Sequence, residues 1–347
     1  MDIIDTLKKD PRWCDNPASA FDLAKDRWGI LFLNMGGPEN TTGVHDYLQN
    51  IFEDPDIIKL PLSFLLQKPL ARVIASRRTE KVIERYNLIG GGSPLIKWSQ
   101  AVADGVNENL LGEYPRIRTA IGMRYTSPFI NSALDELNQK GCRFILIIPL
   151  YPHYSRVTTG TALKQVIKWL SKNKSECRLK VIWDWHDNRE YVSLLRQYIN
   201  TSMSSLNKSD ETRLMFSAHA VPVKLAQGGD PYVKQIETTA RLAGEGFNYI
   251  LSYQSRTGPV KWVEPDSKDM VNKYGQEGIK NLVVVPLSFV SDHIETLYEL
   301  DIELKEIAHS AGIENFIRVP AFNDDPEFIN MLADFVRAHI KSEGNAT

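Results

Sequence analysis

The chain has 347 residues, with 41 Lys and Arg against 43 Asp and Glu and a formal net charge of -2. A hydrophobic share of 43% and a charged share of 24% are typical of globular proteins, and the near-neutral charge argues against a nucleic-acid partner. The sequence has no apolar run long enough for a membrane span, no signal-peptide pattern and only three widely spaced cysteines, so we expect a cytoplasmic protein of about two domains.

Strand-like apolar runs alternate with helix-like stretches along most of the chain. Eight runs are expected to be strands, at 28–35, 118–125, 143–151, 179–185, 213–219, 249–254, 281–289 and 315–319. Their continuous apolar cores are typical of parallel strands buried on both faces. Helical patterns lie between them at 128–140, 161–172, 191–206, 232–244 and 266–274, and a last one follows near 325–341.

This order predicts two α/β lobes, each with a four-stranded parallel sheet flanked by helices. We expect an N-terminal lobe at 27–186, a C-terminal lobe at 187–320 and a C-terminal helix at 321–347 that packs back across the lobes.

The segment 52–78 interrupts the alternation of strands and helices. It has three prolines and an apolar cluster among Lys and Arg residues, made of Leu62, Phe64, Leu65, Leu66 and Leu70. Long loops inside compact domains are usually functional, and this mixture is expected of a surface that touches lipid or an apolar ligand. The alternative is a short core helix with flanking loops.

Two glycine-rich turns do not match nucleotide-binding motifs. The turn at 34–38 is not GxGxxG, and the turn at 90–94 lacks the Gly-Lys-Ser/Thr ending of a phosphate loop. Nucleotide binding is therefore not predicted.

Titratable residues follow two of the expected strands in the second half of the chain. His219 ends one strand, which places it at the edge of the sheet where ligands bind. Glu295, Glu299 and Glu303 recur every four residues after another strand, with no Lys or Arg between 291 and 303. Such a row is either a solvated face or a path for a hard divalent cation, and the spacing leaves both open.

Ring-bearing residues follow the strands of both halves. Arg124 and Tyr125 end one strand and could bind a flat, anionic ligand. Tyr151 and Ser155 follow the next strand, and Trp262 comes from the second half. Together they indicate a cleft between the lobes that suits a large planar acid and a metal ion.

At this point the sequence resembles the ferrochelatases, which insert Fe2+ into a porphyrin in the last step of haem biosynthesis. The resemblance rests on LNMGGP at 33–38, RRTEKV at 77–82, IGGGSP at 89–94, GMRY at 122–125, YPHYSRVTTG at 151–160, SAHAVP at 217–222, GDPY at 229–232, YQSRTGPVKW at 253–262 and SDHIETLYELDIE at 291–303. It implies a lyase with two Rossmann-like lobes around a porphyrin cleft.

The resemblance also implies roles for individual residues. His219 and Glu295 are expected to be catalytic. The residues expected to meet the metal are His219, Glu295, Asp292, His293, Glu299 and Glu303, and those expected to meet the porphyrin are Met35, Arg124, Tyr125, Tyr151, Ser155 and Trp262. Met35 favours protoporphyrin IX, because the coproporphyrin-type enzymes carry Tyr at the matching place.

One departure from the family concerns iron–sulfur clusters. The animal enzymes hold such a cluster with a Cys in the YSxxTTG motif and further Cys residues near the C-terminus, whereas this chain has Arg156 there and no Cys after Cys177. We therefore expect no cluster and no required cofactor, since Fe2+ is a substrate.

The resemblance also implies binding partners and a cellular location. We expect protoporphyrin IX and Fe2+ as ligands, a monomer or weak dimer, and a cytoplasmic location with peripheral contact of 52–78 at the inner face of the membrane. The alternatives are a coproporphyrin III ferrochelatase and a non-catalytic tetrapyrrole- or metal-binding protein.

Overall fold

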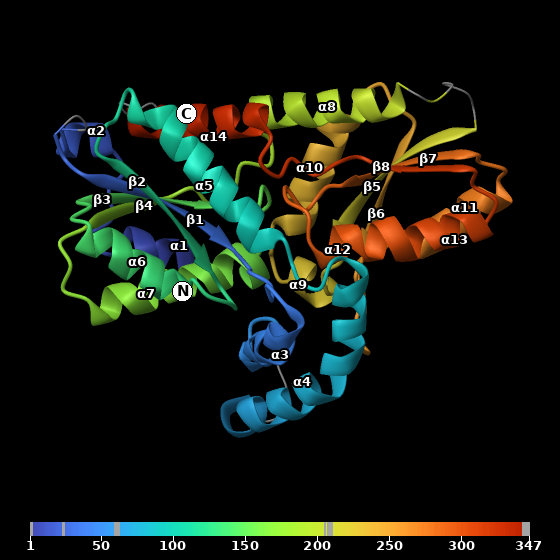
Figure 1. Cartoon of the computed structure of the whole chain (residues 1–347), viewed down its shortest axis with the longest axis horizontal. Coiled ribbons are helices and arrows are strands. Elements are labelled where there is room, and N and C mark those ends of the chain that lie inside the picture. The colour runs from blue at the N-terminus through green and yellow to red at the C-terminus, as the bar shows by residue number, and fades with distance from the viewer. Residues whose placement is uncertain (1–2, 23–24, 59–62, 205, 207–210, 342–347) are drawn as a thin grey trace.

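Two four-stranded sheets, each made of parallel strands, form the centre of the molecule (Figure 1). The structure is a computed structural model that describes residues 3–22, 25–58, 63–204, 206 and 211–341. The first sheet has the order β2-β1-β3-β4 and the second β6-β5-β7-β8, so both repeat one strand order. The strands are β1 (Trp28–Asn34), β2 (Ile117–Met123), β3 (Phe144–Pro149), β4 (Arg178–Val181), β5 (Thr212–His219), β6 (Tyr249–Gln254), β7 (Asn281–Pro286) and β8 (Asn315–Arg318). The two-lobed α/β fold expected from the sequence is confirmed.

All eight predicted strands are present, and the differences lie at their ends. Every residue of β1 and β3 is buried, which explains why their apolar runs are continuous. The runs predicted at 143–151 and 281–289 end earlier, at Pro149 and Pro286. Because proline has no N–H to donate, it removes a hydrogen bond from the ladder and favours the end of a strand.

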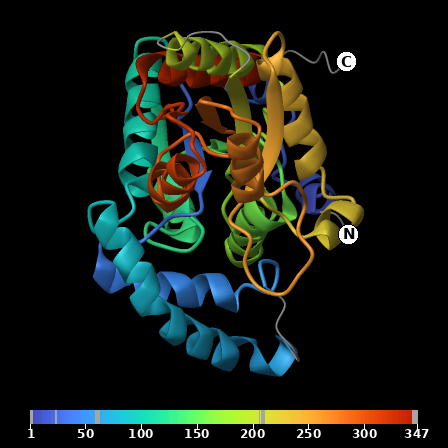
Figure 2. The same ribbon diagram turned by 90° about the vertical axis from the view of Figure 1, so that its right-hand side faces the viewer.

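Helices pack on both sheets and connect their parallel strands (Figures 1 and 2). The longer ones are α5 (Leu95–Leu111), α6 (Ile130–Gln139), α7 (Thr161–Lys172), α8 (Arg189–Met203), α10 (Tyr232–Gly244), α11 (Ser267–Gln276) and α14 (Pro326–Lys341). The shorter ones are α1 (Ile3–Lys8), α2 (Pro17–Ala20), η1 (Thr41–Gly43), η2 (Arg156–Gly160), α9 (Val223–Gln227), α12 (Ile294–Leu297), η3 (Glu299–Leu304) and α13 (Lys305–Ser310). The last helix, α14, packs against both α5 and α8, which connects the end of the chain to elements before and after residue 186.

An arm of two helices, α3 (Val44–Glu53) and α4 (Ser63–Leu88), projects away from the two sheets (Figure 2). The prediction of a long loop at 52–78 is therefore wrong, because α4 includes the second half of that segment. Leu62 lies outside the described residues. Pro69 lies inside α4 and has no N–H to donate to the carbonyl of Leu65, one helical turn earlier. Both residues are exposed. Water can solvate that carbonyl, so the helix tolerates the proline that suggested a break.

The inner side of the arm has a small apolar core of its own. Gln67 Nε2 donates to the carbonyl of Phe52 at 2.7 Å and to that of Ile58 at 2.8 Å, which fixes the turn between the two helices. The buried residues of this core are Val44, Leu48, Phe52, Ala71, Ala75 and Tyr86. Partly buried Ile294, from the second lobe, packs against them, so the arm reaches the segment that follows β7.

Buried hydrogen bonds join the two lobes where the chain leaves β3. Ser155 Oγ and the backbone N of Arg156 donate to Asp230 Oδ2 at 3.1 and 2.7 Å. The backbone N of Tyr154 donates to Gln235 Oε1 at 2.6 Å. Because buried donors without an acceptor are costly, this polar contact fixes the relative position of the lobes.

Removing the acceptor at this contact should destabilise the fold. Asp230→Ala leaves three donors without their partner, namely Ser155 Oγ and the backbone N–H groups of Arg156 and Tyr232, and we expect the free energy of unfolding to fall by about 2–3 kcal/mol. Urea unfolding measures the change. Asp104→Ala, which removes an exposed carboxylate contact on α5, serves as the control and should change stability by about 0.5 kcal/mol or less. Equal losses in the two variants would contradict the role given to Asp230.

Candidate active site

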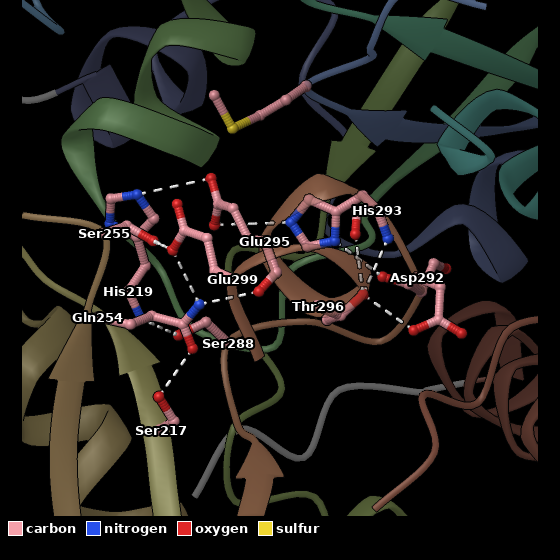
Figure 3. A network of polar contacts seen from close by, with 12 residues as sticks. Ser217, His219, Gln254, Ser255, Ser288, Asp292, His293, Glu295, Thr296 and Glu299 are labelled. Atoms are coloured by element: carbon pink, nitrogen blue, oxygen red, sulfur yellow. Dashed lines mark hydrogen bonds and ion pairs between the residues drawn. The ribbon is translucent and has the colours of Figure 1, made fainter. Parts of the chain in front are cut away.

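His219 is the last residue of β5, and hydrogen bonds to its backbone and to its ring hold it in place. Its N–H donates to Ser288 Oγ at 3.0 Å, and its carbonyl accepts from Tyr232 Oη at 3.0 Å. Its ring nitrogen Nδ1 lies 2.7 Å from the carbonyl oxygen of Ala220. The other ring nitrogen, Nε2, faces Glu295 Oε1 at 3.6 Å (Figure 3).

A second histidine approaches Glu295 from the other side (Figure 3). His293 precedes α12, and its Nδ1 lies 3.1 Å from the carbonyl oxygen of Ser291, while its Nε2 lies 3.6 Å from Glu295 Oε2. The ring of Phe289 contacts both imidazoles, with centroid distances of 6.5 Å to His219 and 4.3 Å to His293. One carboxylate therefore lies between two imidazoles beside an aromatic ring.

The contacts of Nδ1 assign the same tautomer to both neutral histidines. A carbonyl oxygen can only accept, so Nδ1 carries the proton in His219 and in His293. In the neutral rings Nε2 then has a free lone pair, and once Nε2 takes a proton the ring faces the Glu295 carboxylate as a cation. The site thus presents two basic nitrogens on either side of one carboxylate.

The two neighbouring glutamates have opposite electrostatic surroundings. Burial raises the pKa of Glu295, but the charges of His219 and His293 outweigh it, so this pKa lies below its ordinary value. Burial, followed by the charge of Glu295, raises the pKa of Glu299. Oε2 of Glu295 has no hydrogen-bond partner among the described residues, and its contact with His293 Nε2 at 3.6 Å is an ion pair only when that imidazole is protonated. Glu295 is therefore the carboxylate that stays ionised.

Glu299 lies in a wide helical turn, η3, directly after the residues of α12. Ser255 Oγ and Gln254 Nε2 donate to its Oε2, the latter at 3.2 Å, and Gln254 Nε2 also donates to the carbonyl of Glu295 at 2.9 Å (Figure 3). The backbone N of Glu303 donates to the carbonyl of Tyr298 at 2.9 Å, five residues earlier, which is the π-helical spacing. Gln254 and Ser255 thus link the end of β6 to both glutamates.

The acidic row does have basic partners, contrary to the sequence-based expectation. Lys268 Nζ lies 2.9 Å from Glu303 Oε2, and Arg318 pairs with Asp301 and Asp292. These cations come from α11 and β8, so a search within 291–303 could not find them. The structure brings His219, His293, Glu295 and Glu299 together, whereas Asp292 and Glu303 point to their own partners. Within the described ranges, no group of three or more His, Cys, Asp and Glu side chains is arranged to hold a metal ion.

Arg124 and Tyr125 lie at the carboxyl end of β2 and contact the arm. Arg124 Nη2 donates to Asp54 Oδ2 at 2.6 Å, and Tyr125 Oη donates to the same oxygen at 2.9 Å. The guanidinium lies over the Tyr125 ring at 4.7 Å. Sequence analysis did not single out Asp54, although it lies in the FEDPD stretch of the segment 52–78. The structure therefore uses this Arg–Tyr pair to fix the arm, and its predicted contact with porphyrin stays a prediction.

The remaining residues predicted to meet the porphyrin are distributed around the same sheet edges. Met35 directly follows β1, and its carbonyl accepts from the backbone N of Tyr125 at 2.9 Å. Trp262 lies beside the segment after His219, where it pairs with Pro222, and its Nε1 is buried without a hydrogen-bond partner in the part of the chain that is described. Ser155 instead donates to Asp230 between the lobes.

Two tyrosines from the first lobe and the arm are close to the carboxylate. Burial, followed by the charge of Glu295, raises the pKa of Tyr47 in α3. Burial also raises the pKa of Tyr151, with Tyr125, Tyr47 and Glu295 among its charged neighbours. Tyr47 was missed in the sequence because it falls in an ordinary amphipathic helix. The charge of Glu295 therefore acts on one phenol of the arm and on one from the segment after β3.

Comparison with known proteins identifies relatives of this chain. The Ferrochelatase family model matches residues 27–340. The chain is 41% identical over 318 residues to the ferrochelatase of Rippkaea orientalis, covering 90% of this chain and 82% of that protein. It is also 41% identical over 325 residues to the ferrochelatase of Nostoc punctiforme, covering 91% and 83%.

A solved structure is similar in fold. SirB from Bacillus subtilis with Fe3+ superposes with a TM-score of 0.55 at 13% identity, covering 91% of this chain and 96% of that one. At that identity the likeness concerns the fold alone, and the sequence matches decide the family. The chain belongs to the ferrochelatase family.

Proposed function

We propose that this protein inserts Fe2+ into protoporphyrin IX to give protohaem, as the last step of haem biosynthesis. The observation that carries the proposal is the ionised Glu295 between two imidazoles that direct Nε2 toward it. Metalation of a porphyrin releases two pyrrole protons as the metal enters, so the reaction needs a proton acceptor and a group that attracts a dication. Family membership supports the same reaction class.

His219 is the proposed proton acceptor in this reaction. Its Nδ1–H donates to the Ala220 carbonyl, which leaves Nε2 free to take a proton. The two pyrrole protons leave in succession, so His219 releases the first to water before it takes the second. Glu295 would stabilise the resulting imidazolium, or attract the incoming Fe2+, at the same position. Bending the flat macrocycle exposes its nitrogen lone pairs, and binding energy from the rest of the ring offsets that strain.

Protoporphyrin IX is the proposed porphyrin, with coproporphyrin III as the alternative. The two differ in that protoporphyrin IX has vinyl groups where coproporphyrin III has two further propionates. Met35, at the sheet edge beside Tyr125, has an apolar thioether that favours a vinyl group over a charged carboxylate.

A zinc assay with both porphyrins tests the proposed function. Purified protein, Zn2+ and protoporphyrin IX should give fluorescent zinc porphyrin with many turnovers per protein, and coproporphyrin III should react more slowly. A non-catalytic binding protein would give at most one product per protein. A faster reaction with coproporphyrin III would overturn the substrate assignment but leave the reaction class standing.

Removing the imidazole should remove most of the activity. We expect His219→Ala to lower kcat at least about 10²-fold, the usual contribution of a positioned acid–base group, without unfolding the protein. Initial rates measure kcat, and circular dichroism checks the fold. A kcat close to that of the wild type would exclude His219 as the proton acceptor.

The acidic residues should differ in their effects. Glu295→Gln removes the ionised carboxylate and should abolish insertion while porphyrin still binds, which fluorescence titration measures. Glu303→Gln, which breaks only the contact with Lys268, should mainly change the dependence of the rate on metal concentration. If both substitutions are equally mild, the row is a solvated face.

We also propose that the arm touches the membrane surface. Leu65, Leu66 and Val73 of α4 are 67%, 39% and 47% exposed, and exposed Lys68 and Arg72 lie among them. Apolar side chains beside cations fit a lipid surface with anionic headgroups. None of the described helices combines the length and apolarity needed to cross a bilayer. The proposed location is the cytoplasm, at the inner face of the membrane.

Replacing the exposed apolar residues of the arm should weaken membrane binding. Each contributes on the order of 1–3 kcal/mol when buried in lipid, so changing Leu65, Leu66 and Val73 together to Ser should abolish flotation on anionic vesicles. Leu111→Ser with Val260→Ser, which changes exposed apolar residues outside the arm, is the control and should leave flotation unchanged. A wild-type protein that never floats at low salt would contradict this proposal.

No iron–sulfur cluster and no other cofactor are part of the proposal. Clusters are usually held by four thiolates, and the chain has three cysteines, all buried and unpaired. A monomer or weak dimer is proposed as the working form. The colour and iron content of the purified protein, and its elution volume, test these two points.

A further inference from the structure

Arg318, the last residue of β8, connects two acidic residues on either side of the catalytic segment. Its Nε and Nη2 donate to Asp301 Oδ1 and Oδ2 at 2.7 and 2.9 Å, in the two-pronged geometry that guanidinium groups favour. Its Nη1 lies 3.1 Å from Asp292 Oδ1. The Arg318 side chain is only 11% exposed, so water screens these contacts weakly.

Asp292 transmits this contact to the backbone of His293. Thr296 Oγ1 donates to Asp292 Oδ1 at 2.9 Å and accepts from the backbone N of His293 at 3.0 Å (Figure 3). Asp292 also exchanges two hydrogen bonds with Asn323, at 2.8 and 2.9 Å. The start of α12, and with it the direction of the His293 ring, is therefore fixed from the side of Arg318.

Asp301 transmits the contact to the wide turn that holds Glu299. Asp301 lies inside η3, where the π-type hydrogen bond from Glu303 to Tyr298 replaces the usual α-helical one. Such turns are rare and are frequently found at functional sites. The two bonds from Arg318 hold this turn from outside the helix.

A second arginine also pairs with two carboxylates, but away from the active site. Arg337 on α14 pairs with Glu113 Oε2 at 2.8 Å and with Asp334 Oδ1 at 2.7 Å. It also bridges two carboxylates, but it joins the C-terminal helix to the end of α5 and touches no residue of the active site. Arg337 is therefore a matched control for Arg318.

We propose that Arg318 is a positioning residue that holds His293 and Glu295 in register with Glu299 by joining Asp292 to Asp301. The inference rests on the proposed function, since it assigns a part in the same reaction. Arg318 touches neither porphyrin nor metal in this assignment, and it acts through the geometry of the α12–η3 segment. Loss of this contact displaces the catalytic groups, and displacements of about 1 Å cost on the order of 10²-fold in rate.

The zinc assay on four single variants and one double variant tests the proposal. Arg318→Gln should lower kcat by about 30- to 100-fold while KM for porphyrin stays within about threefold of the wild type. Asp301→Asn should reproduce that loss of kcat. The double variant with Arg318→Gln and Asp301→Asn should be no worse than Arg318→Gln alone, because each substitution removes the same interaction. Arg318→Lys should keep only part of the activity, since an ammonium cannot bond both carboxylates in the same geometry. Arg337→Gln should leave kcat within about twofold of the wild type, even if its unfolding midpoint falls as far as that of Arg318→Gln.

Three results would overturn the proposal. The first is a kcat of Arg318→Gln within about threefold of the wild type, and the second is a change confined to KM. The third is a loss of kcat that is in the same proportion to the fall in unfolding midpoint in the Arg318 and Arg337 variants. If Arg318→Gln does not fold, Arg318→Lys and Asp301→Asn decide by the same criteria. A wild-type protein without turnover contradicts the proposed function itself, whereas an active wild type with an active Arg318→Gln contradicts only the positioning role.

Discussion

A carboxylate withdrawn from water has to be stabilised by nearby positive charge, and Glu295 imposes this constraint on the rest of the site. Burial alone would favour its neutral form, and the two imidazoles reverse that preference when they are protonated. Each imidazole in turn needs a fixed orientation, which backbone carbonyls provide at Ala220 and Ser291. Because these carbonyls belong to segments directly after β5 and β7, the position of the charge depends on the second sheet.

The contacts around this carboxylate extend to the strands β5 and β6 of the second sheet. Gln254 illustrates how they connect, because its Oε1 accepts from Ser217 in the middle of β5 while its Nε2 donates toward the two glutamates. The arm closes the other side, since Ile294 packs on its core and Arg85 lies over the Tyr298 ring at 5.0 Å. Arm and second lobe therefore meet at the segment that carries Glu295.

Most of the fold follows from the apolar pattern, but several contacts at the site do not. The eight strands were predictable because each is a continuous apolar run, and His219 and Glu295 because they follow such runs within recognisable motifs. The helix α4 was not, because its prolines suggest breaks that an exposed helix tolerates. The partners of the acidic row, Lys268 and Arg318, come from elements distant in sequence, and no local spacing reveals such a pair. The hydrogen bond from Ser155 to Asp230 also joins residues distant in sequence, and the predicted contact of Ser155 with porphyrin stays a prediction.

The two sheets share one strand order, yet their carboxyl edges carry different chemistry. The first edge presents Met35 and the Arg124–Tyr125 pair, and the second presents the histidines and glutamates. Under the proposed function, a substitution after β1 or β2 can therefore alter which ring substituents fit without touching the groups proposed to handle protons and metal. Such a division would let one lobe diverge in substrate preference while the other preserves the reaction, so a fold with two similar α/β units offers a scaffold on which selectivity and reactivity can evolve separately.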